Sequence, residues 1–438
     1  MPGLSAATSH RSPLRRELHD PILDVMDFLN EVSFRYPDAI SFAAGRPPED
    51  LFDVAPVAHA LDEFVAHAAG TGDLDEAWNE LGRYNRTNGI VNAAVARHLL
   101  LDEEIHVEPD AIMVTVGAQE AMAVTLMGLF DPATDVLLVS DPAYVGITGL
   151  ARMIGIRVVP VPAGASGLEP DVVEASIAAA SRHGRARALY DVPDFNNPLG
   201  TQMPLEHRRA LLDICRRHDL LFIEDNAYGM FRYEGEKLPT VKALDTSSTV
   251  LYIGSFAKTI FPSLRLGYLV ADQLVAESGR TLASELSRVK GYLTVNTSTL
   301  LQGMCAGTLA RAGGSLEPLV RPKRERLRHN RDVLLDALGD AFAPLRSRVT
   351  WNRPAGGFFL TLTVPFEFGA AELGHCAADY GVIACPMRFF SLCGDRRQQI
   401  RLAFAHLGDE AIREGVARLS RYIHERARTT NTSAEGSC

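Results

Sequence analysis

The sequence has few of the features that mark secreted, metal-binding or nucleic-acid-binding proteins. Only six of its 438 residues are cysteines, and they show no C-x-x-C pair and no regularly spaced histidines, so we expect neither a disulfide framework nor a metal site. Acidic residues outnumber basic ones by 54 to 44, for a formal net charge of -10. That balance argues against nucleic acid or an anionic membrane as the main partner. We expect a reducing, cytoplasmic location.

Long apolar runs are also missing. Residues 1–20 contain no apolar segment of the kind found in a secretory signal. The longest uncharged run, residues 291–310, contains several Thr, Asn, Ser and Gln residues and is too polar to span a bilayer. We therefore expect no membrane partner and predict a buried or interface helix for residues 291–310.

The size and the order of the predicted elements indicate more than one domain. The chain exceeds the length of roughly 250 to 300 residues at which one core usually divides, and strands alternate with helices between residues 111 and 254. Residues 272–312 are predicted to be helical, followed by a long helix over 318–342. Strands with fewer helices between residues 348 and 404 indicate a smaller α+β domain.

The most informative stretch is a buried strand followed by a lysine. Residues 250–253 are apolar and β-rich, and Lys258 follows after a polar turn. Alone, such a lysine is most simply a surface residue whose stem lies on apolar surface. Ser255 and Arg265, however, add a hydroxyl and a planar cationic group to the same turn. The combination suits a lysine that forms a Schiff base with a phosphorylated aldehyde.

Other strand ends carry polar groups as well. The turn at residues 117–119 opens a helix and directs backbone N–H groups at an anion. Asn197 lies in an N-P-x-G turn after the strand 188–192, and Asp225 follows the strand 220–224 with Tyr228 three residues later. A turn asparagine or a loop acid needs no function of its own.

One arginine lies in an apolar strand. Arg401 is flanked by Ile400 and Leu402, and a buried guanidinium without a partner is costly. Its partner is either a carboxylate of the protein or a carboxylate of the substrate.

These segments together resemble a known family. Ser-Phe-Ala-Lys258 followed by Leu-Arg265-Leu-Gly-Tyr resembles the cofactor-lysine segment of the class I/II aminotransferases, the fold-type I enzymes that depend on pyridoxal 5'-phosphate (PLP). The resemblance covers roughly residues 20–425. Seven residues follow in the order of the family: Asn197, Asp225, Tyr228, Ser255, Lys258, Arg265 and Arg401.

The resemblance implies the catalytic roles. Lys258 would hold PLP as an imine and, once freed by the substrate, carry a proton from the substrate Cα to the cofactor C4'. Asp225 would keep the pyridine nitrogen protonated, so that the ring accepts electrons. Asn197 and Tyr228 would stabilise the 3'-oxyanion, and Asn197 would also face the substrate.

The resemblance also implies the binding residues. The phosphate would be held by Ser255, Arg265 and the turn of Gly117, Ala118 and Gln119.

Four further positions follow from the same resemblance. Tyr144 would stack on the pyridine ring, and Tyr84 would reach across a dimer to the phosphate of the partner's cofactor, the alternative being a surface tyrosine. Arg401 would grip the substrate α-carboxylate. Gly45 would bring its backbone close to the substrate. Beside it, Arg46 stands where the family more often has an apolar residue, and we predict that it also contacts the substrate.

The implied fold is the PLP-transferase fold type I. We expect an α/β large domain over residues 51–317, with a mostly parallel seven-stranded-type sheet. A smaller α+β domain should combine residues 14–50 and 318–426, with loose tails at 1–13 and 427–438. The family also implies an obligate homodimer, and cofactor residues at strand ends fit the way α/β sheets bind ligands.

Alternatives remain at this point. The same scaffold supports PLP-dependent lyases and decarboxylases, because the outcome depends on which Cα bond stands perpendicular to the ring. PLP-binding domains also serve in transcription regulators, which carry a DNA-binding module; the short segment before the first helix leaves no room for one, so we expect an enzyme.

The substrate is indicated only by unusual residues near the expected pocket, namely Phe42, Arg46, Arg388, Phe389 and Phe390. They resemble the branch that contains the α-aminoadipate and kynurenine aminotransferases and the hydroxyphenylglycine aminotransferases of antibiotic pathways. We expect transamination between a bulky L-amino acid, aryl or polar-ended and possibly non-proteinogenic, and a 2-oxo acid.

Overall fold

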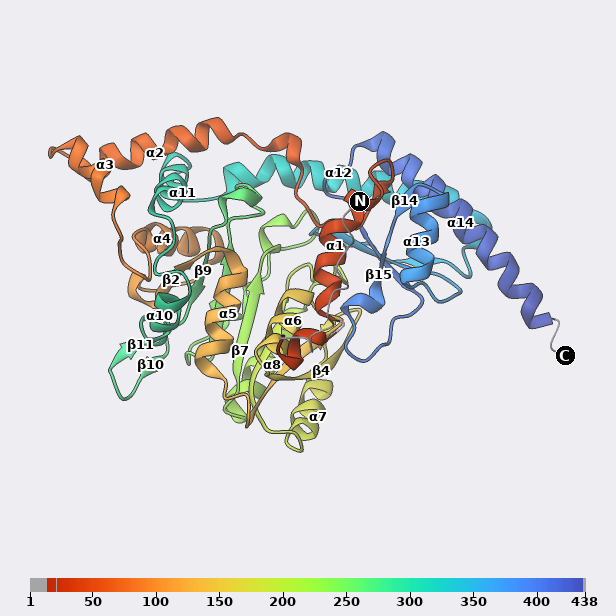
Figure 1. Ribbon diagram of the computed structural model, residues 1–438, viewed down its shortest axis with the longest axis horizontal. Coiled ribbons are helices and arrows are strands. Elements are labelled where there is room, and N and C mark those ends of the chain that lie inside the picture. The colour runs from red at the N-terminus through yellow and green to blue at the C-terminus, as the bar shows by residue number, and fades with distance from the viewer. Residues whose placement is uncertain (1–13, 21, 436–438) are drawn as a thin grey trace, which may run out of the picture.

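The computed structural model describes residues 14–20 and 22–435. A large central sheet with helices around it occupies one part of the molecule, and a smaller sheet with α12, α13 and α14 occupies the other (Figure 1). Helix α1 (Leu23–Arg35) lies between the two parts, and α14 (Asp409–Glu435) extends beyond the smaller sheet. Helix α1 ends at Arg35, shortly before Pro37.

The central sheet is mostly parallel, as expected. Its order is β2-β9-β8-β7-β6-β3-β4-β5, in which β8, β7, β6, β3 and β4 are parallel neighbours and β9 runs antiparallel to β8 and β2. The eighth strand, β5, is a two-residue antiparallel addition to β4. The strands are β2 (Ile112–Thr115), β3 (Asp135–Asp141), β4 (Arg157–Gly164), β5 (Gly167–Leu168), β6 (Arg185–Asp191), β7 (Leu221–Asn226), β8 (Val250–Ser255) and β9 (Gly267–Val270).

Helices connect and cover these strands. Every residue of β2, β3 and β9 is buried, as expected for strands covered on both faces. The helices in this part are α4 (Asn92–Glu103), α5 (Gly117–Leu129), α6 (Val145–Met153), α7 (Pro170–Ala180), α8 (Leu205–Arg217), α9 (Val241–Leu244) and α10 (Leu282–Leu293).

Two helices extend along one end of the molecule. These are α2 (Val54–Ala69) and α3 (Leu74–Gly82), and α2 packs on α11 (Thr299–Arg311) (Figure 1). The approach is close because α11 has a glycine there: a Cβ on Gly307 would lie 1.9 Å from the carbonyl oxygen of Ala60.

The smaller sheet is antiparallel, with the order β12-β13-β16-β15. Near it β1, from the start of the chain, pairs in parallel with β14, with Ile40 opposite Val382. Both chain ends therefore contribute to this part, while the exact domain boundaries remain a prediction. The elements are β1 (Ile40–Ser41), α12 (Glu317–Ala341), β12 (Thr350–Trp351), β13 (Phe359–Thr363), α13 (Ala370–Asp379), β14 (Val382–Ile383), β15 (Cys385–Pro386), β16 (Gln399–Ala403) and α14 (Asp409–Glu435).

Two expectations about residues 272–312 were wrong. The segment begins with a hairpin, β10 (Leu274–Val275) and β11 (Arg280–Thr281), whose turn contains Gly279 at a φ of 66°. The run 291–310 is also two helices, because α10 ends at Leu293 before α11 begins. In the break, the Thr297 hydroxyl donates to the Val114 carbonyl, a bond that a continuous helix would not place there.

The C-terminal tail was also predicted wrongly in part. The predicted loose segment from residue 427 continues α14 as far as Glu435. Adding residues to an existing helix costs far less free energy than nucleating a new one. The packed first half of α14 can therefore continue into a polar second half that has only a weak apolar pattern. The predicted tail at residues 1–13 lies outside the described residues.

Candidate active site

A cavity of about 340 Å³ lies where the loops that follow β7 and β8 meet the smaller sheet. Most of the predicted site residues line it, which is the place where α/β sheets bind ligands. Those residues are Gly45, Arg46, Ala118, Gln119, Tyr144, Asn197, Asp225, Tyr228, Ser255, Lys258, Arg265 and Arg401.

Lys258 extends into this cavity from the turn after β8. Its Nζ donates to the carbonyl oxygen of Gly45, 2.7 Å away. Burial, together with the Arg265 and Arg401 guanidinium groups, lowers the pKa of Lys258 to about 8. A larger fraction of the amine is therefore neutral near pH 7 than in an exposed lysine, and only a neutral amine can attack a carbonyl.

Asp225 lies at the end of β7 with its two carboxylate oxygens in different situations. Oδ2 accepts a hydrogen bond from the Tyr190 hydroxyl at 2.7 Å. Oδ1 is buried without a hydrogen-bond partner, and burial raises the pKa of Asp225 to about 6 although the Tyr190 hydrogen bond lowers it. A buried oxygen without a donor is costly, so this side of the cavity suits a ligand that brings an N–H group.

Arg401 is held in one plane inside the cavity. Its guanidinium lies between two rings, 4.7 Å from the centre of Phe359 and 4.5 Å from that of Phe390. Nη1 donates to Oδ1 of Asn197 at 2.9 Å, and Nη2 donates to the carbonyl of Ala43. Nε is buried without a partner, and no carboxylate among residues 14–20 and 22–435 pairs with this arginine. The internal ion pair considered from sequence is therefore not present among these residues.

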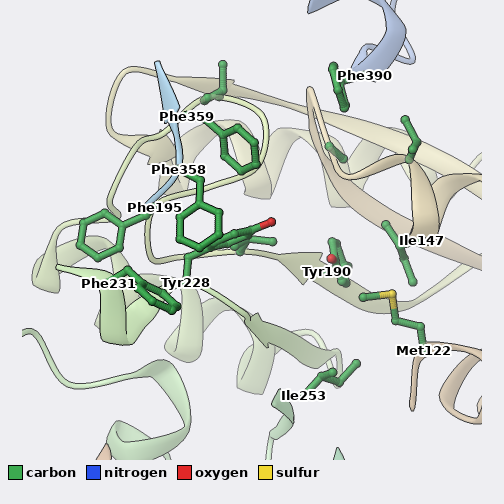
Figure 2. Packing of buried hydrophobic residues seen from close by; sticks show 14 of the residues in the cluster. Met122, Ile147, Tyr190, Phe195, Tyr228, Phe231, Ile253, Phe358, Phe359 and Phe390 are labelled. Atoms are coloured by element: carbon green, nitrogen blue, oxygen red, sulfur yellow. The ribbon is translucent and has the colours of Figure 1, made fainter. Parts of the chain in front are cut away.

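Tyr228 projects from the turn after β7 toward the same space. Its ring makes edge contacts with Phe358 at 5.2 Å and Phe359 at 5.5 Å (Figure 2). The pKa of its hydroxyl is raised mainly by burial and further by the nearby Tyr144 and Asp225. The group therefore stays protonated and available as a donor at neutral pH.

The anion-binding corner forms at the start of α5. This helix begins at Gly117, so the turn predicted at residues 117–119 is its first turn and carries free N–H groups. Gly117 has a φ of 71°, and a Cβ there would lie 2.8 Å from Nη2 of Arg265. The positive φ favours glycine, and a side chain there would displace the end of this arginine. Gly117 contributes in this way without lining the cavity itself.

Tyr144 immediately precedes α6 and lines the cavity. Its ring occupies space that Gly146 leaves open, because a Cβ on Gly146 would lie 2.2 Å from that ring. Gln119 lies between the two: its Nε2 donates to the Gly146 carbonyl at 3.1 Å, and its Oε1 accepts from the Tyr144 hydroxyl at 3.5 Å. The aromatic wall and the anion-binding corner are therefore connected.

Some predicted positions lie elsewhere. Arg388 is exposed and does not line the cavity, since it points outward from η7 (Met387–Phe390). Phe42 is fully buried and packs where Gly415 of α14 leaves room. Phe389 contacts Phe28 of α1, with ring centres 5.5 Å apart. The expectation that these three residues shape the pocket was wrong, because side chains on a short helix point in different directions and Phe42 belongs to the core.

Two other positions keep their predicted roles untested. Arg46 lines the cavity, is partly exposed and forms an ion pair with Glu49 at 3.5 Å. Tyr84 is 88% exposed and does not line the cavity of its own chain.

Several contributors were not predicted. Tyr190 stands in β6 and reaches Asp225, and its one sequence signal is a phenol after the two apolar residues Ala188 and Leu189. The remaining unpredicted residues form the apolar and small-residue lining: Met26, Ala43, Ala44, Met122, Val145, Val192, Ala227 and Ala257.

The comparison with protein families decides what this site belongs to. Aminotransferase class I and II matches residues 38–419, most of the chain. The chain belongs to this family. It is a PLP-dependent aminotransferase that exchanges an amino group between an amino acid and a 2-oxo acid, and the lyase and decarboxylase alternatives have no support in these comparisons.

Relatives of this aminotransferase agree with the branch indicated by the sequence. It is 42% identical over 429 residues to the (S)-3,5-dihydroxyphenylglycine transaminase of Amycolatopsis orientalis, covering 97% of each chain. It is 31% identical to the 2-aminoadipate transaminase of Thermus thermophilus, covering 88% of this chain and 90% of that one. The crystal structure of Pyrococcus horikoshii kynurenine aminotransferase superposes with a TM-score of 0.80 at 26% identity, covering 92% and 94%. These matches confirm fold type I.

The described residues form neither a metal site nor a membrane-spanning helix. Among the described residues, no three His, Cys, Asp or Glu side chains are grouped so as to hold a metal ion. In the same part of the chain, none of the helices has the length and apolar character needed to cross a membrane.

Proposed function

We propose that the cavity binds PLP through the residues predicted from the sequence. The observation that carries this proposal is the orphaned Oδ1 of Asp225 facing the same cavity as the Lys258 amine. Asp225 would pair with the protonated pyridine nitrogen, and Arg265, Ser255 and the first turn of α5 would hold the phosphate. Bound PLP supplies the carbonyl that takes up the amino group and the electron-poor ring that accepts charge from the substrate Cα.

The protein groups would then divide the remaining work. Lys258, with its lowered pKa, would attach the cofactor and afterwards take and return the Cα proton. Arg401 would bind the α-carboxylate with its unpartnered Nε and the adjacent Nη, and its two flanking rings would fix the plane of that contact. Tyr144 would cover the ring, while Asn197 and Tyr228 would face the 3'-oxygen.

We also propose a bulky aryl or polar-ended amino acid as the donor. The substrate end of the cavity has Phe390 and Met26 as apolar walls and Arg46 as a cation. Burying an aromatic ring gains about 1.5 to 3 kcal/mol, which an alanine-sized donor cannot supply. The relative whose name includes (S)-3,5-dihydroxyphenylglycine supports a hydroxylated arylglycine, whose phenolic hydroxyls could accept hydrogen bonds from Arg46.

Arg46→Leu is expected to raise KM about 5- to 10-fold for hydroxylated aryl donors, because it removes one charge-assisted hydrogen bond. It should leave alanine kinetics and the absorbance of bound PLP unchanged, because Arg46 has no proposed cofactor contact. Steady-state kinetics with matched hydroxylated and plain phenylglycines measure this. If no donor responds to the change, Arg46 serves only its ion pair with Glu49.

We propose in addition that the functional unit is a homodimer. Tyr84 and Tyr292 are 88% and 96% exposed, and Leu74, Trp78 and Val295 are also exposed. Such large apolar side chains on one end of the molecule are typical of an interface. The phosphate role that the family resemblance implies for Tyr84 supports the same arrangement.

We also propose a cytoplasmic location, which the free thiols of the five described cysteines, four of them buried, support.

Tyr84→Phe is expected to weaken PLP binding about tenfold while the dimer persists, because the ring remains and only the hydroxyl contact with the partner's cofactor is lost. Titration of the apoenzyme with PLP, together with sedimentation, measures both properties. Tyr380→Phe is the matched control, since that hydroxyl bonds Glu425 away from the cavity. A fully active monomer of the unmodified protein would contradict the shared site.

A further inference from the structure

Tyr190 occupies an unusual position for a buried tyrosine. It lies in β6, beside β7, with its backbone opposite Ile223, and none of its side chain is exposed. Its hydroxyl donates to Oδ2 of Asp225 at the end of that neighbouring strand, 2.7 Å away. Figure 2 shows Tyr190 to one side of the ring cluster that contains Tyr228 and Phe358.

We propose that Tyr190 is a positioning residue for Asp225. Its hydroxyl donates to Oδ2 and thereby fixes the rotation of the carboxylate, leaving Oδ1 as the oxygen that the cofactor can use. This inference rests on the role proposed for Asp225 and adds a residue that does not touch the cofactor itself.

The electrostatic effect has a definite sign. A carboxylate in a buried place is destabilised relative to its protonated form, and a donated hydrogen bond offsets part of that cost. The Tyr190 hydroxyl lowers the pKa of Asp225, while burial raises it to about 6. Burial, followed by the charge and the hydrogen bond of Asp225, raises the pKa of Tyr190 well above its usual value. Tyr190 is therefore a permanent donor at neutral pH.

Other ionisable groups surround this pair. Tyr144 and Tyr228 face Asp225 from the cavity side, and burial raises the pKa of both hydroxyls. The buried carboxyl of Asp191, beside Tyr190, has a pKa raised to about 6, and that of Glu224, beside Asp225, is raised to about 7. The carboxyls of Asp191 and Glu224 titrate in the same pH range as Asp225. The effect of the Tyr190 contact is therefore measured by comparing the pH profiles of the variants, not from one profile alone.

The test is the dissociation constant of PLP from the apoenzyme as a function of pH, for the unmodified protein and for Tyr190→Phe. PLP affinity should fall on the acid side as Asp225 becomes protonated. Removing the donor raises the pKa of Asp225, so this fall should begin at a higher pH, by about one unit. At pH 7 we expect kcat to fall about tenfold, with KM for the amino donor little changed.

Two further variants separate the possible outcomes. Tyr268→Phe is the matched control: this tyrosine is also buried in the sheet, but its hydroxyl is 3.4 Å from Nε2 of His98 and does not bond Asp225. It should reproduce any general loss of stability without moving the pH profile. Replacing Tyr190 by 3-fluorotyrosine keeps the ring and strengthens the donor, so it should move the acid-side fall to lower pH. The 3-fluorotyrosine protein provides the same test if the Tyr190→Phe protein does not fold.

The result that would overturn the inference is an acid-side profile in Tyr190→Phe, or in the fluorotyrosine protein, that matches the unmodified enzyme. Asp225→Asn distinguishes this from failure of the proposed function. If Asp225→Asn weakens PLP binding strongly while changes at Tyr190 do not move the profile, only the positioning role is wrong. If Asp225→Asn leaves PLP affinity unchanged, the proposed role of Asp225 is wrong as well.

Discussion

Lys258→Ala should lower turnover by about 10³-fold or more, because it removes both the amine that attaches the cofactor and the group that moves the Cα proton. PLP should still bind, since the phosphate corner and Asp225 are untouched, but the pH-dependent absorbance of the imine should disappear. Absorbance spectra and steady-state rates of the same preparation measure both effects.

A lysine near the sheet but outside the cavity provides the control. Lys237 donates to the Asp102 carbonyl and does not line the cavity, so Lys237→Ala should keep the absorbance and rate of the unmodified enzyme. Adding methylamine to Lys258→Ala should restore part of the rate by replacing the missing base. A Lys258→Ala protein with normal turnover would be incompatible with the proposed site.

Arg401→Lys should lower kcat/KM for every amino donor by about 10²-fold, mostly through KM. Lysine keeps the positive charge but cannot present two parallel N–H groups, and a charge-assisted hydrogen bond contributes about 1.5 to 3 kcal/mol. The space between the rings of Phe359 and Phe390 would also be poorly filled. Because Arg401 has no proposed contact with PLP, cofactor affinity should change little.

The neighbouring arginine of η7 gives the matched comparison. Arg388 is exposed and does not line the cavity, so Arg388→Lys should behave as the unmodified enzyme does. Equal losses in the two variants would mean that the loss does not come from the planar contact of Arg401. An Arg401→Lys enzyme with unchanged KM would remove Arg401 from the substrate contacts.

Much of the site could be predicted from sequence because the chemistry is concentrated at strand ends. In an α/β sheet, an apolar run followed by a polar residue identifies both a strand and its ligand-facing end. Asp225 at the end of β7 and Lys258 after β8 illustrate this: their strands are neighbours and parallel, so the two side chains reach one cavity.

The parts that failed depend on side-chain direction or on distant packing. In Met387–Phe390 the sequence gives no indication that Phe390 turns inward while Arg388 turns outward. The Tyr190 contact crosses from one strand to the next, which a reading along the chain cannot detect. The hairpin of β10 and β11 was missed because two-residue strands carry almost no periodic signal.

The most direct test of the whole account is a half-reaction with the amino donor alone and no 2-oxo acid. Mixing the PLP enzyme with excess (S)-3,5-dihydroxyphenylglycine, or with L-alanine or L-aspartate for comparison, and recording absorbance reports conversion of PLP to pyridoxamine phosphate. We expect one equivalent of pyridoxamine phosphate per site, formed fastest with the aryl donor. Release of carbon dioxide or ammonia without pyridoxamine phosphate, or faster conversion with alanine and aspartate, would contradict the account.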